Sequence, residues 1–88
     1  MKKQTIKDIA AVLTTKMRTV NTFIEGYEGE GMSLKRECPI YNELRGMLRM
    51  LDIMGVSYEI VYKKAECDTF NGIIIDGEFY DAYGIYKR

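Results

Sequence analysis

The residues that most readily suggest chemistry are carboxylates in the last third of the chain. A few converging carboxylates and a lysine could hold Mg²⁺ for phosphodiester cleavage. However, Asp76 precedes Gly77 and is explained as a turn residue, and the other acids fall on expected loops or strand edges. This pattern therefore predicts no metal site. The acids of residues 65–86, which contain no Lys or Arg, are Glu66, Asp68, Asp76, Glu78 and Asp81.

Other catalytic groups are sparse. The chain contains no histidine, which is the commonest general base and the commonest transition-metal ligand. Ser-His and Cys-His nucleophile pairs are therefore excluded. Cys38 and Cys67 are the two cysteines, and they lack the CxxC spacing of an ordinary structural zinc site. We expect a protein that is not an enzyme and that uses no metal and no other cofactor.

Two arginines, Arg45 and Arg49, stand four residues apart on a stripe that also carries Tyr41 and Asp52. On a helix, like charges at this spacing repel each other slightly. An acidic protein would relieve this repulsion, and so would a nucleic-acid phosphate. Basic residues beside an aromatic ring are also a pattern of nucleic-acid binding. Tyr41, Arg45 and Arg49 are therefore candidate contacts to a nucleic acid or an acidic partner, unless the chain's own acids neutralise the arginines.

The elements that must position these residues begin with two helices. Apolar residues in steps of three and four predict a first helix from Thr5 to about Tyr27, with Thr5 as its N-cap. Its other face is rich in threonine, which indicates that this face is covered rather than open to solvent. The stripe consists of Ile6, Ala10, Leu13, Met17, Val20, Ile24 and Tyr27.

A second helix is expected to begin at Pro39 and to stop at Gly55. Met50 and Ile53 widen its apolar arc beyond what one packing partner usually requires. Either this helix is sandwiched between the sheet and the first helix, or part of the arc meets another chain. Its main stripe is Ile40, Leu44, Met47, Leu48, Leu51 and Met54.

Strand signals fill the rest of the chain. Residues 56–63 alternate with a period of two, and Asp76-Gly77 between apolar runs is a strong hairpin signal. A two-residue turn pairs Ile75 with Glu78, and the register continues to Ile73 and Tyr80. The sequence therefore predicts a single α+β domain over residues 1–88. In this fold, two N-terminal helices pack on one face of a three-stranded antiparallel sheet, in the order ααβββ.

The closing hairpin has apolar residues on both of its faces. One face carries Ile74, Phe79, Tyr83 and Ile85, and the other carries Ile73, Ile75, Tyr80, Ala82 and Tyr86. Because helices cover only one face in a two-layer domain, the other face must be a contact surface, fold back near Gly84 or carry scattered surface tyrosines. We place Phe79 and Ile74 inward because phenylalanine has no polar atom to satisfy.

This orientation defines a predicted protein interface. Large, stiff tyrosine side chains with a polar tip are enriched at interfaces. The exposed part of the second helix adds two apolar residues, and self-association as a homodimer would cover the same surface. The predicted interface residues are Ile73, Ile75, Tyr80, Tyr86, Met50 and Ile53.

The sequence also indicates how charge is distributed along the chain and in which compartment the protein resides. The net charge is zero, yet residues 1–24 carry five Lys or Arg against Asp8 alone. Either the molecule is electrically two-sided, or its basic start and acidic end lie together and neutralise each other. No stretch approaches the ~20 apolar residues of a membrane span. With two separated cysteines, we expect a cytoplasmic protein with free thiols.

Function is expected to lie in binding. The missing catalytic residues and the tyrosine-bearing sheet favour a small protein-interaction module, an inhibitor or adaptor that binds another protein or a second copy of itself. The alternative is a small nucleic-acid-binding or regulatory protein that uses the basic first helix with Arg45 and Arg49. In general character the chain resembles the short proteins of phages and mobile elements, including anti-CRISPR inhibitors, although no particular residue carries this resemblance. It implies an inhibitor of host defence.

Overall fold

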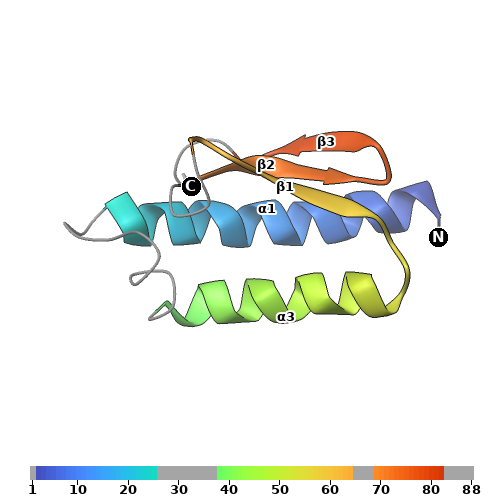
Figure 1. Ribbon diagram of the computed structural model, residues 1–88, viewed down its shortest axis with the longest axis horizontal. Coiled ribbons are helices and arrows are strands. Elements are labelled where there is room, and N and C mark those ends of the chain that lie inside the picture. Colours follow the sequence, from blue (N-terminus) through green and yellow to red (C-terminus); the bar gives the residue numbers. More distant parts are fainter. Residues whose placement is uncertain (1, 26–37, 65–68, 83–88) are drawn as a thin grey trace.

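The computed structural model describes residues 2–25, 38–64 and 69–82 (Figure 1). Among these residues, two helices are followed by three strands, which form an antiparallel sheet in the order β1-β2-β3. The predicted α+β fold is therefore confirmed. The elements are α1 (Lys3–Glu25), α3 (Pro39–Ile53), β1 (Tyr58–Tyr62), β2 (Phe70–Ile75) and β3 (Glu78–Asp81).

Helix α1 begins two residues earlier than the sequence suggested. The carbonyl of Lys2 accepts a hydrogen bond from the Ile6 amide at 3.1 Å, so Thr5 lies inside the first turn and is not the N-cap. The predicted end near Tyr27 lies outside the described residues. The apolar stripe is confirmed, because its members from the first to the penultimate turn are buried: Ile6, Ala10, Leu13, Met17 and Val20.

Helix α3 has the predicted boundaries. Cys38 precedes it in an extended conformation (φ −81°, ψ 117°), and Pro39 occupies the first turn, where its missing N–H costs no helical hydrogen bond. Gly55, with a φ of 74°, lies just beyond the C-terminus in the left-handed conformation that favours glycine. The buried residues Leu44, Leu48 and Leu51 face the core.

The hairpin between β2 and β3 also matches its prediction. Asp76 and Gly77 have φ angles of 51° and 86°, as a two-residue type I′ turn requires. Ile75 pairs with Glu78, and the register continues to Ile73 and Tyr80.

The inward face of this hairpin is the opposite of the one predicted. Ile73 and Ile75 are fully buried against the helices, whereas the Phe79 side chain is 54% exposed. Gly72 supplies a physical reason, because a Cβ atom on it would lie 2.8 Å from the Phe79 ring. The ring thus covers a backbone position that has no side chain, as aromatic residues do over strand glycines. Phe79 gains packing on the outer face, and the branched isoleucines fill the core.

Substitution of Gly72 by alanine is expected to lower the free energy of unfolding by about 1–3 kcal/mol. The new methyl group would clash with the backbone carbonyl of Tyr80 and with the Phe79 ring, so β3 would have to move. Urea unfolding measures the effect. Gly46→Ala is the control, because a Cβ there meets nothing within 4 Å; it should raise stability by about 0.5–1 kcal/mol. A Gly72→Ala protein as stable as the wild type would contradict the close approach.

The helices do not cover the three strands equally. Helix α1 packs against β2, β3 and α3, and it runs between the sheet and α3 in the view of Figure 1. The principal partner of β1 is β2. The side chains of Tyr58, Ile60 and Tyr62 on β1 consequently remain half-buried.

A buried polar residue of α1 forms hydrogen bonds that hold the ends of β2 and β3 together. Asn21 is fully buried. Its Nδ2 donates to the carbonyls of Phe70 at 3.0 Å and Ala82 at 3.3 Å, and its Oδ1 accepts from the Phe70 amide at 2.8 Å. Asn21 lies on the threonine-rich face of the helix. That face is therefore covered in part by the strands themselves.

Candidate functional site

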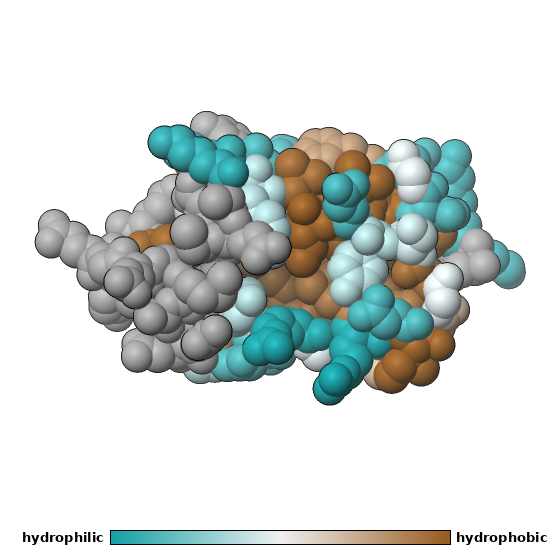
Figure 2. All heavy atoms as spheres, in the orientation of Figure 1, coloured by the Kyte–Doolittle hydropathy of each residue, from teal (hydrophilic) through white to brown (hydrophobic). Residues whose placement is uncertain are grey.

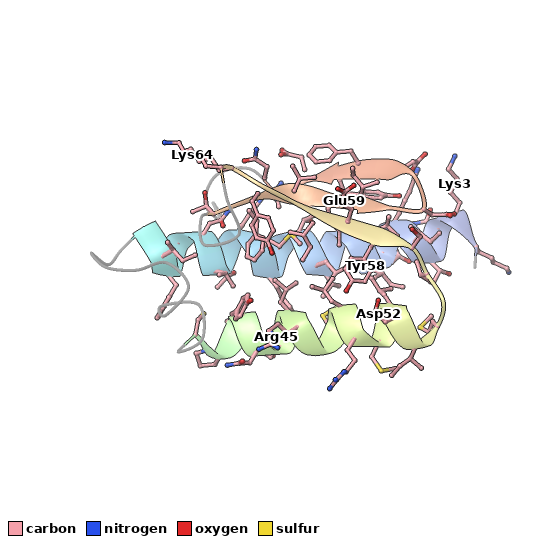
Figure 3. All side chains as sticks on the ribbon, viewed as in Figure 1. Lys3, Arg45, Asp52, Tyr58, Glu59 and Lys64 are labelled. Atoms are coloured by element: carbon pink, nitrogen blue, oxygen red, sulfur yellow. The ribbon has the colours of Figure 1, made fainter. Side chains whose placement is uncertain are left out.

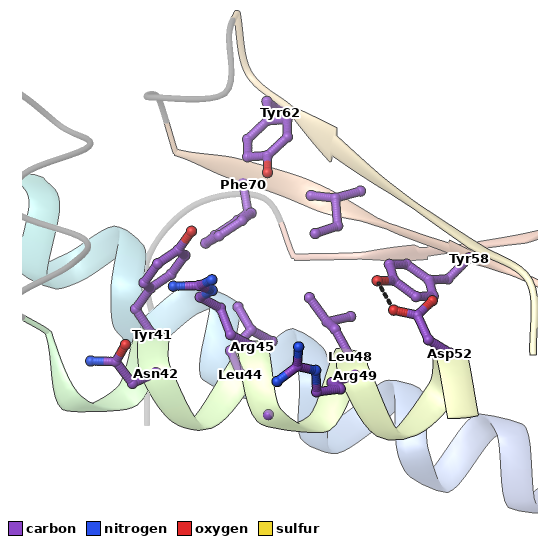
Figure 4. Close-up of a pocket in the computed structure, with 12 residues that line it drawn as sticks. Tyr41, Asn42, Leu44, Arg45, Leu48, Arg49, Asp52, Tyr58, Tyr62 and Phe70 are labelled. Carbon is purple, nitrogen blue, oxygen red and sulfur yellow. Dashed lines mark hydrogen bonds between the residues drawn. The ribbon is translucent and has the colours of Figure 1, made fainter. Parts of the chain in front are cut away.

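A groove with a volume of about 540 Å³ lies between α3 and β1 (Figure 4). Helix α3 supplies one wall, and the half-buried side chains of β1 supply the other. We call this feature the α3–β1 groove. Its principal lining residues are Tyr41, Arg45, Arg49, Asp52, Tyr58, Ile60, Tyr62 and Phe70.

Helical spacing brings the polar residues of α3 to one wall. The leucine stripe of α3 turns toward the core, and this orientation leaves Tyr41, Arg45 and Arg49 along the groove. Both arginine side chains are exposed. The Arg45 guanidinium lies 5.9 Å from the centroid of the Tyr41 ring, a cation–π contact that holds the charge at the groove. The structure thus brings together the three residues that the sequence singled out as candidate contacts.

Aromatic rings close one end of the groove. The register between β1 and β2 shifts between Val61 and Tyr62. Residues three apart on a regular strand point to opposite faces, but this irregularity lets both Phe70 and Ile73 point inward. The Phe70 ring lies 5.4 Å from the Tyr62 ring and 6.5 Å from the Tyr41 ring, measured between centroids. This end is therefore apolar, with tyrosine hydroxyls at its margin.

The other end of the groove is polar and carries a negative charge. The Tyr58 hydroxyl donates to Asp52 Oδ2 at 3.3 Å, and both residues point toward each other across the groove in Figures 3 and 4. Partial burial, followed by the nearby Asp52 carboxylate, raises the pKa of Tyr58. Tyr58 therefore stays protonated and remains a hydrogen-bond donor.

The ion pairs among the described residues do not include the groove arginines. Lys3 pairs with Glu78 at 3.6 Å and Arg18 with Asp81 at 4.0 Å. The basic start and acidic end of the chain therefore lie together, as one of the two expectations held. Lys16 pairs with Glu43 at 3.5 Å. Within residues 2–25, 38–64 and 69–82, no acidic side chain forms an ion pair with Arg45 or Arg49.

The predicted protein interface is partly wrong. Ile73 and Ile75 belong to the core, because their side of the hairpin faces α1. Tyr80 is half-buried and packs against the core, while its hydroxyl donates to Glu78 at 3.0 Å. Tyr86 lies outside the described residues.

The two predicted interface residues on α3 are exposed. Met50 and Ile53 are 55% and 73% exposed, and Met54 adds to the same end of the helix. An apolar area over the C-terminal end of α3 is visible in Figure 2. This area does not line the groove, so the predicted residues on α3 divide between two separate surfaces.

The sequence missed the strand side of the groove. Tyr58, Ile60 and Tyr62 share one face because side chains alternate along a strand, and this alternation was visible in the sequence. Nothing in the sequence placed that face opposite Arg45 and Arg49. The inward turn of Phe70 depends on the register shift, which has no signature in residue types.

The pKa of Glu78 tests the contacts of its carboxylate with Tyr80 and with Lys3, which is labelled in Figure 3. The Tyr80 hydroxyl, and then the charge of Lys3, lower the pKa of Glu78. A carboxyl group with a lowered pKa in the folded state stabilises the fold above its ordinary pKa, and this contribution is lost as the pH falls through the lowered value. Tyr80→Phe and Lys3→Gln should each raise the pKa of Glu78. Carboxyl-carbon NMR titration measures both; an unchanged pKa in Tyr80→Phe would contradict the assignment.

Metal-ligating side chains do not cluster among the described residues. No group of three or more Cys, Asp or Glu residues gathers in a position to hold a metal ion within the described ranges. Cys38 is buried and is not in a disulfide. No helix among these residues has both the length and the apolar character needed to cross a membrane. The arrangement of the α3–β1 groove is suited to binding.

No family model, curated protein or solved structure matches the chain.

Proposed function

We propose that this chain is a non-enzymatic protein-interaction module, an inhibitor or adaptor, and that its partner binds in the α3–β1 groove. The observation that carries the proposal is the pair Arg45 and Arg49, which border an aromatic groove without forming an ion pair among the described residues. Arginine and tyrosine are enriched among the residues that dominate protein interfaces. The general resemblance to phage-encoded inhibitors favours inhibition, and a free thiol at Cys38 is in keeping with a cytoplasmic site of action.

Charge distribution favours a protein over a nucleic acid. A nucleic-acid surface requires several basic residues free to meet phosphates. Three basic residues of α1, namely Lys3, Lys16 and Arg18, already lie beside carboxylates. The basic first helix is therefore less available to phosphates than its sequence suggested.

Nucleic-acid binding is retained as a second candidate because of one contact. The Arg45 guanidinium over the Tyr41 ring places a cation and an aromatic face in the same groove. Single-stranded nucleic acids are bound by such combinations. In this case affinity should fall steeply with salt.

Capture from a bacterial lysate tests the proposal, with the tagged chain as bait and with or without nuclease. We expect a protein that is retained after nuclease treatment. Gly46 lines the groove and has open space around it, so Gly46→Trp should block the groove and abolish capture, whereas Gly46→Ala should not. Recovery of nucleic acid, with the proteins lost on nuclease treatment, would favour the second candidate. Equal capture by Gly46→Trp would contradict the groove as the binding site.

A further inference from the structure

Among the described residues, one edge of strand β1 pairs with no other strand, and this edge lies beside the α3–β1 groove. The Asp76 amide donates to the Ser57 carbonyl at 3.0 Å, and the Lys63 amide donates to the Thr69 carbonyl at 2.9 Å. Because bonded and non-bonded residue pairs alternate along an antiparallel ladder, the backbone N–H and C=O groups of Tyr58 and Ile60 point away from β2. No described strand pairs with this edge. Such an edge is a template for another strand.

The helical layer is wider than the sheet that it covers. Two packed helices span about 20 Å with their side chains, which matches about four strands at a spacing of about 4.8 Å. The sheet has three strands, and α1 already packs against β2 and β3. A fourth strand beside β1 would lie over α3, and its inward side chains would enter the groove.

We propose that the partner inserts an extended acidic segment between β1 and α3, where it pairs with β1 as a fourth strand. This inference rests on the proposed function and specifies the chemistry of the partner. Main-chain hydrogen bonds to Tyr58 and Ile60 hold the segment, and alternate side chains enter the groove, as in other cases of strand addition.

The spacing of the arginines defines the pattern of the segment. Residues four apart on a helix are separated by about 6 Å along its axis, and alternate residues of a strand are separated by about 6.6 Å. Two successive inward side chains of the segment can therefore meet Arg45 and Arg49, and both should be acidic. The next inward position lies over the Tyr41 and Phe70 rings and should be apolar. Asp52 disfavours an acid at the opposite end.

A second copy of this chain fits the edge less well. Pairing of two β1 strands about a two-fold axis would bring the two α3 helices, with their Arg45 and Arg49 side chains, near each other. The residues that β1 turns inward are Tyr58, Ile60 and Tyr62, none of which is acidic. Charge complementarity therefore selects an acidic partner segment, and self-association becomes an outcome of the test.

Synthetic peptides test the inference directly. The probe is a capped, fluorescent peptide with Thr at outward positions and Phe, Glu and Glu at successive inward positions, and its reversed sequence covers the other strand direction. We expect one of the two to bind the full chain in fluorescence anisotropy. Replacement of both Glu residues by Lys should weaken binding by roughly 100-fold, corresponding to about 1.4 kcal/mol for each contact.

Backbone methylation separates strand addition from side-chain binding. One version of the peptide carries N-methyl groups on its inward residues and another carries them on its outward residues. In either strand direction only one set of amides faces β1, so one version should lose at least about tenfold in affinity and the other should keep it. Equal affinities of the two versions would overturn strand addition.

The remaining outcomes are also decisive. Failure of both acidic peptides to bind, or concentration-dependent dimerisation through β1 in light scattering, would overturn the inference. Lysate capture by the Gly46→Trp and Gly46→Ala baits then shows separately whether the groove binds a partner in some other way. If the peptides fail to bind but capture depends on the groove, only the proposed fourth strand is excluded. If capture does not depend on the groove, the proposed function is excluded as well.

Discussion

The double variant Arg45→Glu, Arg49→Glu is expected to lose at least about 100-fold in affinity for its partner, while its free energy of unfolding falls by no more than about 1 kcal/mol. Each arginine should form a charge-assisted hydrogen bond worth about 1.5–3 kcal/mol, and reversal of its charge adds repulsion from the acidic partner. This small loss of stability reflects the exposed cation–π contact between Arg45 and Tyr41. Both arginine side chains are exposed, and neither forms an ion pair among the described residues.

The matched control for this variant is Lys2→Glu, Lys7→Glu. It changes the net charge by the same amount at two exposed positions that do not line the groove. Isothermal titration calorimetry with the captured partner measures both affinities, and urea unfolding measures both stabilities. Equal losses of affinity in the two variants would mean that net charge, and not the groove, governs binding.

The variant Asn21→Ala is expected to lose about 2–4 kcal/mol of unfolding free energy, a large part of the stability of a small domain. It would leave the amide of Phe70 and the carbonyls of Phe70 and Ala82 without the side-chain partners that they have at 2.8–3.3 Å. Each of these groups is in the interior, where an unsatisfied polar group costs most. The ends of β2 and β3 would be released together.

Thr15→Ala is the control for the loss at Asn21. Among the described residues, its hydroxyl bonds to the carbonyl of Ala11 in the same helix, at an exposed site, so the change should stay within about 0.5 kcal/mol. Urea unfolding with an unchanged m-value measures both effects. If Asn21→Ala lowers the free energy of unfolding no more than Thr15→Ala does, Asn21 does not hold β2 and β3 together.

The local elements could be predicted because each has a signal in a few neighbouring residues. Pro39 and Gly55 delimit α3. Asp76-Gly77 readily adopts the positive φ angles of a two-residue turn, and this turn sets the hairpin register. Element order and a two-layer architecture then follow. The first helix turn was misplaced because a Thr that could act as an N-cap also fits inside a helix.

The inward face of the hairpin could not be predicted from its residue types. Both faces are apolar, so the alternation that normally assigns them was uninformative. The preference for burying Phe79 failed because its ring covers Gly72 on the outer face. The same limitation applies to the groove, since Arg45 and Tyr58 come to line it only through tertiary packing.

The measurement that tests the account most directly is amide NMR of the ¹⁵N-labelled chain titrated with its captured partner. The account predicts that the largest chemical-shift changes fall on both walls of the groove, at Arg45 and Arg49 on α3 and at Tyr58 and Ile60 on β1. Changes confined to the exposed end of α3 around Ile53, or to the outer face of the sheet around Phe79, would contradict it.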